Sequence, residues 1–193
     1  MSLAMHQRNH RLLRLFGRFG GDRRAVSAVE FALIAPVMIT LYLGCVEISD
    51  GVAADRKVSL TAAALANLAA QTTTISSTDM TNILNAASAI ISPYDSSKLQ
   101  VTVSCLNIDN NGAAKVKWSA TQNGTARSAG SSHTFDSSTS ALDVANTQLI
   151  LAEASYQYTP IVGTAISGTL TLSDRMFMSP RITTPDYNGT TCS

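Results

Sequence analysis

The sequence predicts an α+β protein in which a long N-terminal helix packs on a small, mostly antiparallel sheet of about four strands. Three observations support this fold class. Residues 25–46 are almost wholly apolar, residues 47–72 favour a helix with an apolar stripe, and separate stretches between residues 98 and 178 have the pattern of strands. A helix with one apolar stripe and a sheet with one apolar face must each bury that surface, so we expect the helix to pack on the sheet.

Residues 1–25 form a basic leader that we expect in the cytoplasm. Residues 1–27 carry six arginines against Asp22 alone, whereas residues 49–193 carry eight basic and ten acidic residues. Positive charge stays on the cytoplasmic side of a membrane segment. A disordered basic tail and a nucleic-acid-binding arm are alternatives for this cluster. Because the cluster abuts an apolar segment, we favour the membrane and expect no nucleic acid as a partner.

Residues 26–48 are the predicted transmembrane helix, which leaves residues 49–193 as one external domain. A helix of the 22 residues from Ala25 to Val46, which are apolar apart from Glu30 and a few hydroxyls, reaches about 33 Å, enough to cross a bilayer core. Pro36 removes one backbone hydrogen bond and should kink this helix. Glu30 is costly in lipid unless something neutralises it. Alternatively, Glu30 is an interfacial carboxylate favoured by the helix dipole.

Beyond the apolar segment, the same helix should continue from about Ala28 to Thr72, with Gly51 as its weak point. A second helix should follow. Ser76 and Asp79 have the spacing of a capping box, and Pro93 should stop the helix after about Ser92.

Four strands are predicted in the remainder of the chain. The first two form a hairpin across the turn Asp109–Gly112. Ala114, Val116, Trp118 and Ala120 should share one face of the second strand. Residues 121–140 should be a loop, and the tail after residue 178 should be irregular. The four predicted strands are residues 98–108, 113–121, 147–159 and 168–178.

Two of the three cysteines fall in the external portion and can pair. Cys45 lies in the apolar segment, where a small buried residue is the expectation. Cys105 and Cys192 would be an obvious pair in an oxidising compartment. Spacing alone does not show that they are close enough to bond.

The sequence offers little to support an enzyme, and we predict no catalytic residues, no metal and no cofactor. His133 is the one histidine outside the leader, and in a Ser/Gly-rich loop we expect it at the solvated surface. No metal-binding motif and no serine-hydrolase motif is present. An exported enzyme remains an alternative, which would require a convergent polar pocket.

The apolar segment itself has three interpretations. It can be an uncut signal anchor, or a secretory signal cleaved after Val52–Ala54, just before Asp55, which would release a secreted adhesion or binding module. It can also be a prepilin-type helix, cut between Ala25 and Val26 and then kept. In that case Glu30 is the fifth mature residue, and the new α-amino group of one subunit can neutralise the carboxylate of a neighbour.

Residues 23–58 resemble the TadE-like family of Tad (tight adherence) pilus pseudopilins. That family has an Arg/Gly-rich start, then A-A-V-E-F-A-L-x-x-P, an apolar run and G-x-x-E. Residues 158–183 also resemble family C-termini, with the ending Pro180–Arg181. The matching positions are Arg24, Ala28, Val29, Glu30, Phe31, Ala32, Leu33, Pro36, Gly44 and Glu47.

The resemblance implies a pilin-like fold and a non-enzymatic role as minor pilin or assembly component of a Tad pilus in the bacterial inner membrane. It implies cleavage by a prepilin peptidase between Ala25 and Val26, although Ala25 stands where the family usually has Gly. It also implies that Glu30 and Phe31 act in subunit assembly. The implied partners are the peptidase, other Tad pilus subunits, inner-membrane assembly proteins and the bilayer.

Overall fold

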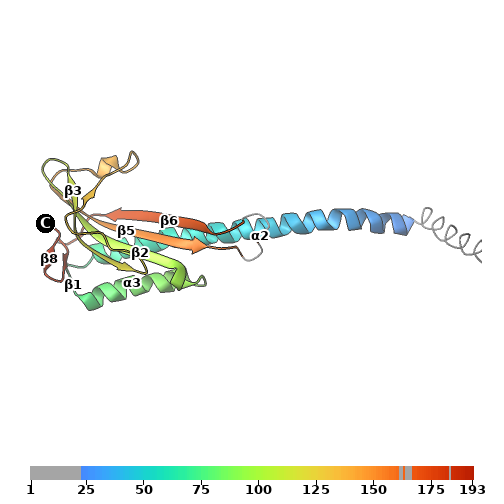
Figure 1. The fold of residues 1–193 in the computed structure, drawn as a ribbon, viewed down its shortest axis with the longest axis horizontal. Helices are drawn as coiled ribbons and strands as arrows, with labels where there is room; N and C mark the ends of the chain where they lie inside the picture. The colour runs from blue at the N-terminus through green and yellow to red at the C-terminus, as the bar shows by residue number, and fades with distance from the viewer. Residues whose placement is uncertain (1–22, 161–162, 164–166, 183) are drawn as a thin grey trace, which may run out of the picture. The chain divides into compact units, whose positions relative to one another are not determined.

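The structure is a computed structural model that describes residues 23–160, 163, 167–182 and 184–193 (Figure 1). The leader, residues 1–22, lies outside the described residues, as does most of the predicted connection from residue 161 to 167. The chain divides into two compact units. One is Met1–Ile48 with Val162–Ile166, and the other is Ser49–Ile161 with Ser167–Ser193. We call the second unit the external domain, after the location that the sequence analysis predicts for it.

The first described element is helix α2, which runs unbroken from Arg23 to Ala70 over 48 residues. The prediction of one long helix is confirmed, although α2 begins earlier than Ala28 and ends before Thr72. Pro36 lies inside the helix. The Thr40 hydroxyl donates a 2.9 Å hydrogen bond to the Pro36 carbonyl, a local contact of the kind that compensates polar backbone in apolar helices.

The second helix, α3, spans Ser77–Ile91 and begins at the predicted capping box. The Ser76 hydroxyl accepts from the Asp79 amide, and the Asp79 carboxylate accepts from the Ser76 amide at 3.1 Å. The Ser76 hydroxyl lies 2.6 Å from the same carboxylate, and its hydrogen bond, followed by that of the Ser76 amide, lowers the pKa of Asp79. The helix ends before Pro93, as predicted.

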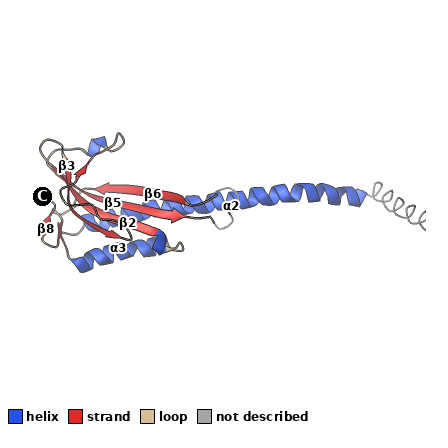
Figure 2. Cartoon of the chain, in the orientation of Figure 1, coloured by secondary structure: helices blue, strands red, loops and turns tan. Residues whose placement is uncertain are grey.

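The external domain contains a five-stranded antiparallel sheet in the order β4-β3-β2-β5-β6 (Figure 2). The four predicted strands are present, and β4 completes the sheet at one edge. A second, three-stranded sheet in the order β1-β7-β8 was not predicted, because two-residue strands leave no pattern in the sequence. The strands are β1 Thr74–Ile75, β2 Leu99–Ile108, β3 Ala114–Gln122, β4 Ser132–His133, β5 Thr147–Tyr158, β6 Leu170–Met178, β7 Asp186–Tyr187 and β8 Thr190–Thr191; short 3-10 turns cover Ser96–Lys98 and Ser140–Leu142.

One face of the large sheet is covered by α3 and the second half of α2. The side chains of both helices and of alternate strand residues form a single buried cluster. Leu65, Val103 and Ile150 are fully buried there. The helix packs on the sheet because its apolar stripe and the apolar face of the sheet exclude water together. The α2 residues of this cluster are Ala54, Val58, Ala62, Leu65, Ala66, Ala69 and Ala70.

The opposite face carries a second, smaller apolar cluster, and a β-bulge sends part of β3 into it. Cys105 pairs with Trp118 but Leu106 pairs with Val116, which leaves Lys117 as the extra residue. A bulge shifts the alternation of the strand that contains it. The prediction of one shared face on β3 is therefore wrong: Trp118 and Ala120 join the cluster under the helices, whereas Ala114 and Val116 join the second cluster.

The predicted loop, residues 121–140, is partly wrong as well. It contains the end of β3 and the edge strand β4, whose His133 pairs with Ala114. We call residues 123–146 the lobe. Phe135 and Leu142 of the lobe pack over the second cluster together with Phe177 of β6. The lobe therefore caps the outer face of the sheet, and His133 is half-buried in it.

Candidate functional site

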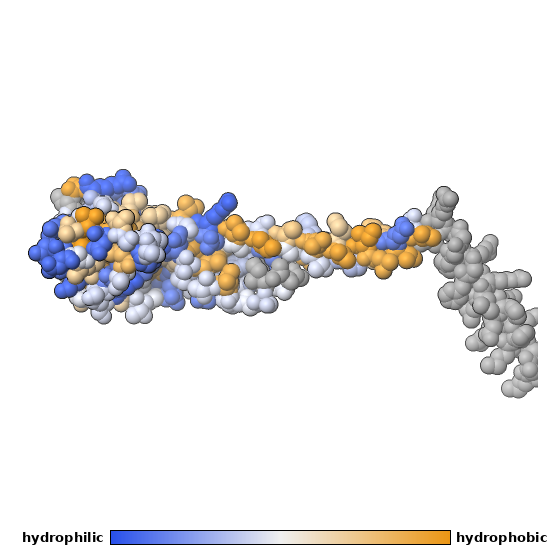
Figure 3. All heavy atoms as spheres, turned by 90° about the horizontal axis from the view of Figure 1, so that it is seen from above, coloured by the Kyte–Doolittle hydropathy of each residue, from blue (hydrophilic) through white to orange (hydrophobic). Residues whose placement is uncertain are grey.

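The first half of α2 exposes large apolar side chains at consecutive positions along the helix. Figure 3 shows one face of this apolar surface. Phe31 is 72% exposed and Leu33 is 70% exposed. Only 6% of the most apolar 18-residue stretch of the helix is buried, so this is not the core helix of a soluble protein. By length and composition, the helix could cross a membrane.

The predicted site residues at the N-terminal end lie in this exposed half. Ala25 and Val26 belong to the first turn of α2, and Glu30 and Phe31 follow about one turn later. Glu30 is exposed, and no hydrogen bond or ion pair joins its carboxylate to another residue in the described part of the chain. One chain by itself therefore leaves the Glu30 carboxylate available to a partner.

A second carboxylate of α2 has the opposite environment. Glu47 is only 4% exposed, although the residues on both sides of it, Val46 and Ile48, are 49% and 54% exposed. Because burying a charge is costly, a carboxylate is found buried where a partner neutralises it or where it has a specific role. The sequence places Glu47 in the G-x-x-E pattern with Gly44, but gives no sign that it is buried.

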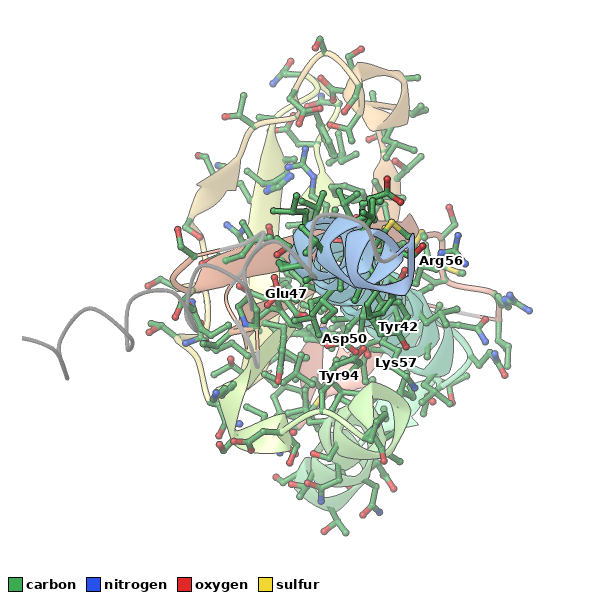
Figure 4. The ribbon with its side chains drawn as sticks, turned by 90° about the vertical axis from the view of Figure 1, so that its right-hand side faces the viewer. Tyr42, Glu47, Asp50, Arg56, Lys57 and Tyr94 are labelled. Carbon is green, nitrogen blue, oxygen red and sulfur yellow. A yellow bond between two sulfur atoms is a disulfide. The ribbon has the colours of Figure 1, made fainter. Side chains whose placement is uncertain are left out.

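The next turn of α2 contains Asp50, which bonds the helix to other parts of the external domain. The Asp50 carboxylate accepts one hydrogen bond from the Tyr94 hydroxyl and one from the Tyr158 hydroxyl, each at 2.9 Å. Tyr94 follows α3, and Tyr158 ends β5, so a single carboxylate joins three parts of the domain. Figure 4 shows Asp50 and Tyr94 directed toward each other.

This environment changes the chemistry of Tyr94. Desolvation, followed by the hydrogen bond to Asp50 and its charge, raises the pKa of Tyr94 to about 12. The phenol therefore stays protonated and acts as a donor throughout the physiological range. Sequence reasoning missed this junction, because Asp50 reads as an ordinary exposed helix residue.

Two turns further along α2, Lys57 reaches the end of α3. Its ammonium group donates a 3.0 Å hydrogen bond to the Ile90 carbonyl. The last carbonyls of a helix have no partner within the helix, and the last turn of α3 contains no basic residue of its own. Lys57 supplies that positive group from the neighbouring helix.

The C-terminal tail is fastened over the far end of α2. Cys105 and Cys192 form a disulfide, with their Cα atoms 5.9 Å apart. The Arg181 amide donates to the Ala70 carbonyl at 2.9 Å, where α2 ends. Strand β7 then pairs in parallel with β1, and the Tyr187 ring packs on Trp118 at a centroid distance of 5.6 Å. The tail is therefore anchored by the disulfide and forms the short strands β7 and β8, which were not predicted, while its other described residues are irregular, as expected.

The outer face of the sheet holds an open polar hollow of about 480 Å³. Glu153 in its wall is bound by Arg127 through two hydrogen bonds of 2.9 and 2.6 Å, and Arg175 pairs with Asp136. Glu153 and Arg175 of the hollow are therefore each paired with a charged group beside it. Among the described residues, no group of three or more His, Cys, Asp or Glu is arranged to hold a metal ion.

Comparison with known families gives one match, and it falls on α2. Residues 25–67 match the family described as TadE-like protein. This segment of the chain is similar to TadE-like proteins. The match confirms the resemblance of residues 23–58 and extends it from Val58 to Asn67, but it does not cover residues 158–183. No curated protein and no solved structure matches the chain.

The TadE-like segment contains Glu30 and Glu47 as well as the domain-fastening residues Asp50 and Lys57. It ends at Asn67, whose side chain accepts a 2.8 Å hydrogen bond from Arg181. The family match therefore covers the helix almost to its end, and the sheet and the lobe lie beyond it.

Proposed function

We propose that this protein is a minor pilin, or pseudopilin, or an assembly component of a Tad pilus, with a role in surface attachment and pilus biogenesis. The observation that carries the proposal is the TadE-like segment. It forms one continuous helix whose first half is apolar on all sides and whose second half is the core of an external domain. A helix of this kind suits a protein that is held in a membrane and packs against other subunits.

In the proposed mechanism, a prepilin peptidase cuts between Ala25 and Val26 and leaves the helix in place. The α-amino group of Val26 then pairs with the Glu30 carboxylate of a neighbouring subunit. The pairing removes the cost of a carboxylate in lipid and fixes the axial stagger of the two helices. Phe31 supplies apolar contact area beside this pair, and Pro36 introduces a bend.

The proposed location is the bacterial inner membrane, with a cytoplasmic N-terminus, a single transmembrane segment over residues 26–48, and the domain of residues 49–193 outside. The disulfide fits an oxidising compartment for that domain. The partners are the prepilin peptidase, other Tad pilus subunits and inner-membrane assembly proteins.

Burial counts against the alternative of a secreted module. A cut before Asp55 would remove Ala54, which is fully buried in the cluster under the helices, and would remove Asp50 with its two tyrosine partners. The released domain would lose its fastening at this end. A retained helix keeps both contacts.

N-terminal sequencing of the mature protein from its own host tests these alternatives directly. We expect the mature chain to begin at Val26. A start at Asp55 would show a secreted module, and a start at Met1 would show an uncut, signal-anchored protein.

A second experiment tests the role of Glu30. Glu30→Gln keeps the size of the side chain and removes the charge, so we expect normal membrane insertion but at least a tenfold loss of the protein from sheared pili. Thr40→Ala is the matched control, an exposed polar residue of the same helix half. Normal piliation in Glu30→Gln cells would contradict the proposed pairing.

A further inference from the structure

The lobe holds a histidine in an environment that resists protonation. The Nε2 atom of His133 is buried and has no hydrogen-bond partner in the described structure. The imidazole lies against the Phe135 ring at 5.1 Å and against the Phe177 ring at 5.8 Å, both centroid distances. Burying a charge without a partner in such apolar surroundings is costly.

The charged groups around His133 have opposing effects on its protonated form. Arg127 of the lobe and Arg175 of β6 oppose a second positive charge, while Glu153 of β5 and Asp136 favour one. Each of these two carboxylates is already bound by one of the two arginines. Asp143 lines the same small hollow as His133. Desolvation and Arg127 together lower the pKa of His133 below its ordinary value.

The lobe is attached to the rest of the domain mostly through exposed or half-exposed groups, so it can open locally. At its two ends, Asn123 donates to the Ser96 and Leu99 carbonyls and the Asn146 amide donates to the Asp109 carbonyl; between them, Arg127 joins Ser119 and Glu153. The edge strand β4 of the lobe pairs with only two residues of β3, and two further backbone hydrogen bonds join Val116 to Gly130 and Ser131, at 2.7 and 2.9 Å. Phe135 and Leu142 supply its apolar contact with the sheet. The ion pairs of the lobe are partly exposed, and such pairs contribute about 0–1 kcal/mol each. Segments with few buried contacts open at a lower free energy than the whole domain.

We propose that His133 is an acid-sensitive latch: its protonation releases the lobe from the sheet and uncovers the apolar cluster beneath. The surface uncovered would include Val116, Leu151 and Phe177, which the lobe covers in the closed form. Acidification thus converts a polar outer face into an apolar one. The inference rests on residues 114–177 and does not depend on how the N-terminal helix is processed.

The sign of the pH effect follows from proton linkage. A released lobe binds the proton at the ordinary histidine pKa, whereas the closed lobe binds it only at lower pH. The stabilisation of the closed form is therefore complete above the ordinary value and is lost as the pH falls through it. For a modest lowering of a histidine pKa, linkage increases opening by about three- to tenfold between pH 7.5 and pH 5.

Hydrogen exchange of the full chain in detergent micelles tests the latch. After correction for intrinsic exchange, the amides of residues 130–135 should lose about three- to tenfold protection over this pH range. Amides at the centre of β2 and β5, such as those of Val103 and Ala152, should keep theirs. His133→Phe keeps an aromatic ring but cannot take a proton, and its lobe should show no such loss. A double variant, His6→Gln with His10→Gln, removes the only other histidines and should respond like the wild type.

Unchanged protection of the wild-type lobe at acid pH would overturn the proposal, as would an equal loss in His133→Phe. A nuclear magnetic resonance titration of the His133 ring gives an independent reading that does not require the variant. Titration at or above the ordinary histidine value would also overturn the latch.

Discussion

The two halves of helix α2 have the same backbone geometry and opposite surroundings. Between residues 26 and 48 apolar side chains point in all directions and stay exposed, whereas between residues 49 and 70 they form a stripe that is fully buried at Val58, Ala62 and Leu65. An apolar stripe needs one neighbour, but a helix that is apolar all round needs an apolar environment on every side. Both halves therefore form a helix. The spacing of the apolar residues decides whether a half needs an apolar environment on every side or an apolar neighbour on one side only.

The largest expected effect concerns the second half of α2 and leaves the first half unchanged. It follows from removing the disulfide that holds the C-terminal tail of the external domain. Cys105→Ser with Cys192→Ser opens a loop that the disulfide closes over a sequence separation of 87 residues. The chain-entropy account gives a loss of about 4–5 kcal/mol in the free energy of unfolding of the domain. Urea unfolding in micelles, followed by the fluorescence of the buried Trp118, measures this loss.

Membrane insertion of the double variant should be unchanged, because the disulfide lies outside the apolar half. Cys45→Ser is the matched control, since Cys45 is outside the disulfide and, contrary to the expectation of a buried residue, is exposed on α2. It should leave the unfolding midpoint of the domain unaltered. An unaltered midpoint in the double variant would mean that the disulfide does not hold the tail.

A pair of identical substitutions compares the two halves directly. Leu65→Ala removes a fully buried side chain of the domain core and should lower the free energy of unfolding by about 3 kcal/mol. Leu33→Ala makes the same change where the side chain is 70% exposed, and its effect on the domain should stay within about 0.5 kcal/mol. Equal effects in urea unfolding would refute the contrast between the halves.

A smaller loss of domain stability is expected at Asp50, where α2 is bonded to Tyr94 and Tyr158. Asp50→Ala removes the carboxylate that accepts from both hydroxyls and should cost the domain about 1–3 kcal/mol. Tyr94→Phe removes one of these hydroxyls together with its hydrogen bond and should cost about 1 kcal/mol. The two losses should not add, because both variants break the same contact.

The same junction predicts a response to alkaline pH. The pKa of Tyr94 is raised to about 12, so its stabilising contribution is complete below its ordinary value of 10.0 and is lost as the pH rises toward 12. In Asp50→Asn the Tyr94 pKa should fall but remain above 10.0, because desolvation is the largest cause of the shift. Ultraviolet titration of tyrosinate measures this; an unchanged Tyr94 pKa would show that Asp50 has no part in it.

Elements whose side-chain pattern repeats over many consecutive residues could be predicted from the sequence. Elements that are fixed by contacts between distant segments could not. The long helix, the capping box at Ser76 and the four longer strands all follow from local patterns. Strand β4 and the sheet β1-β7-β8 have two residues per strand, too few for any period to appear. The bulge at Lys117 reverses the expected faces of β3 without a glycine or another sign in the sequence.

The candidate site shows the same division. Glu30 stands out because a carboxylate interrupts an apolar run, and the family match covers it. Asp50 does not stand out, because its partners Tyr94 and Tyr158 are 44 and 108 residues away in the chain. His133 was expected at the solvated surface, which is wrong, since only the folded sheet brings Phe177 against it.

The parallel pairing of β1 with β7 also imposes an order of events in time. Asp186 pairs with Thr74, so 112 further residues (186 − 74) must be made before the small sheet can close. At about 5–20 residues per second this takes about 6–22 s. Throughout that interval the end of α2 lacks its cover. Cys105, once made, stays an unbonded thiol until Cys192 follows 87 residues later, so the disulfide can form only after the strands of the small sheet have been made.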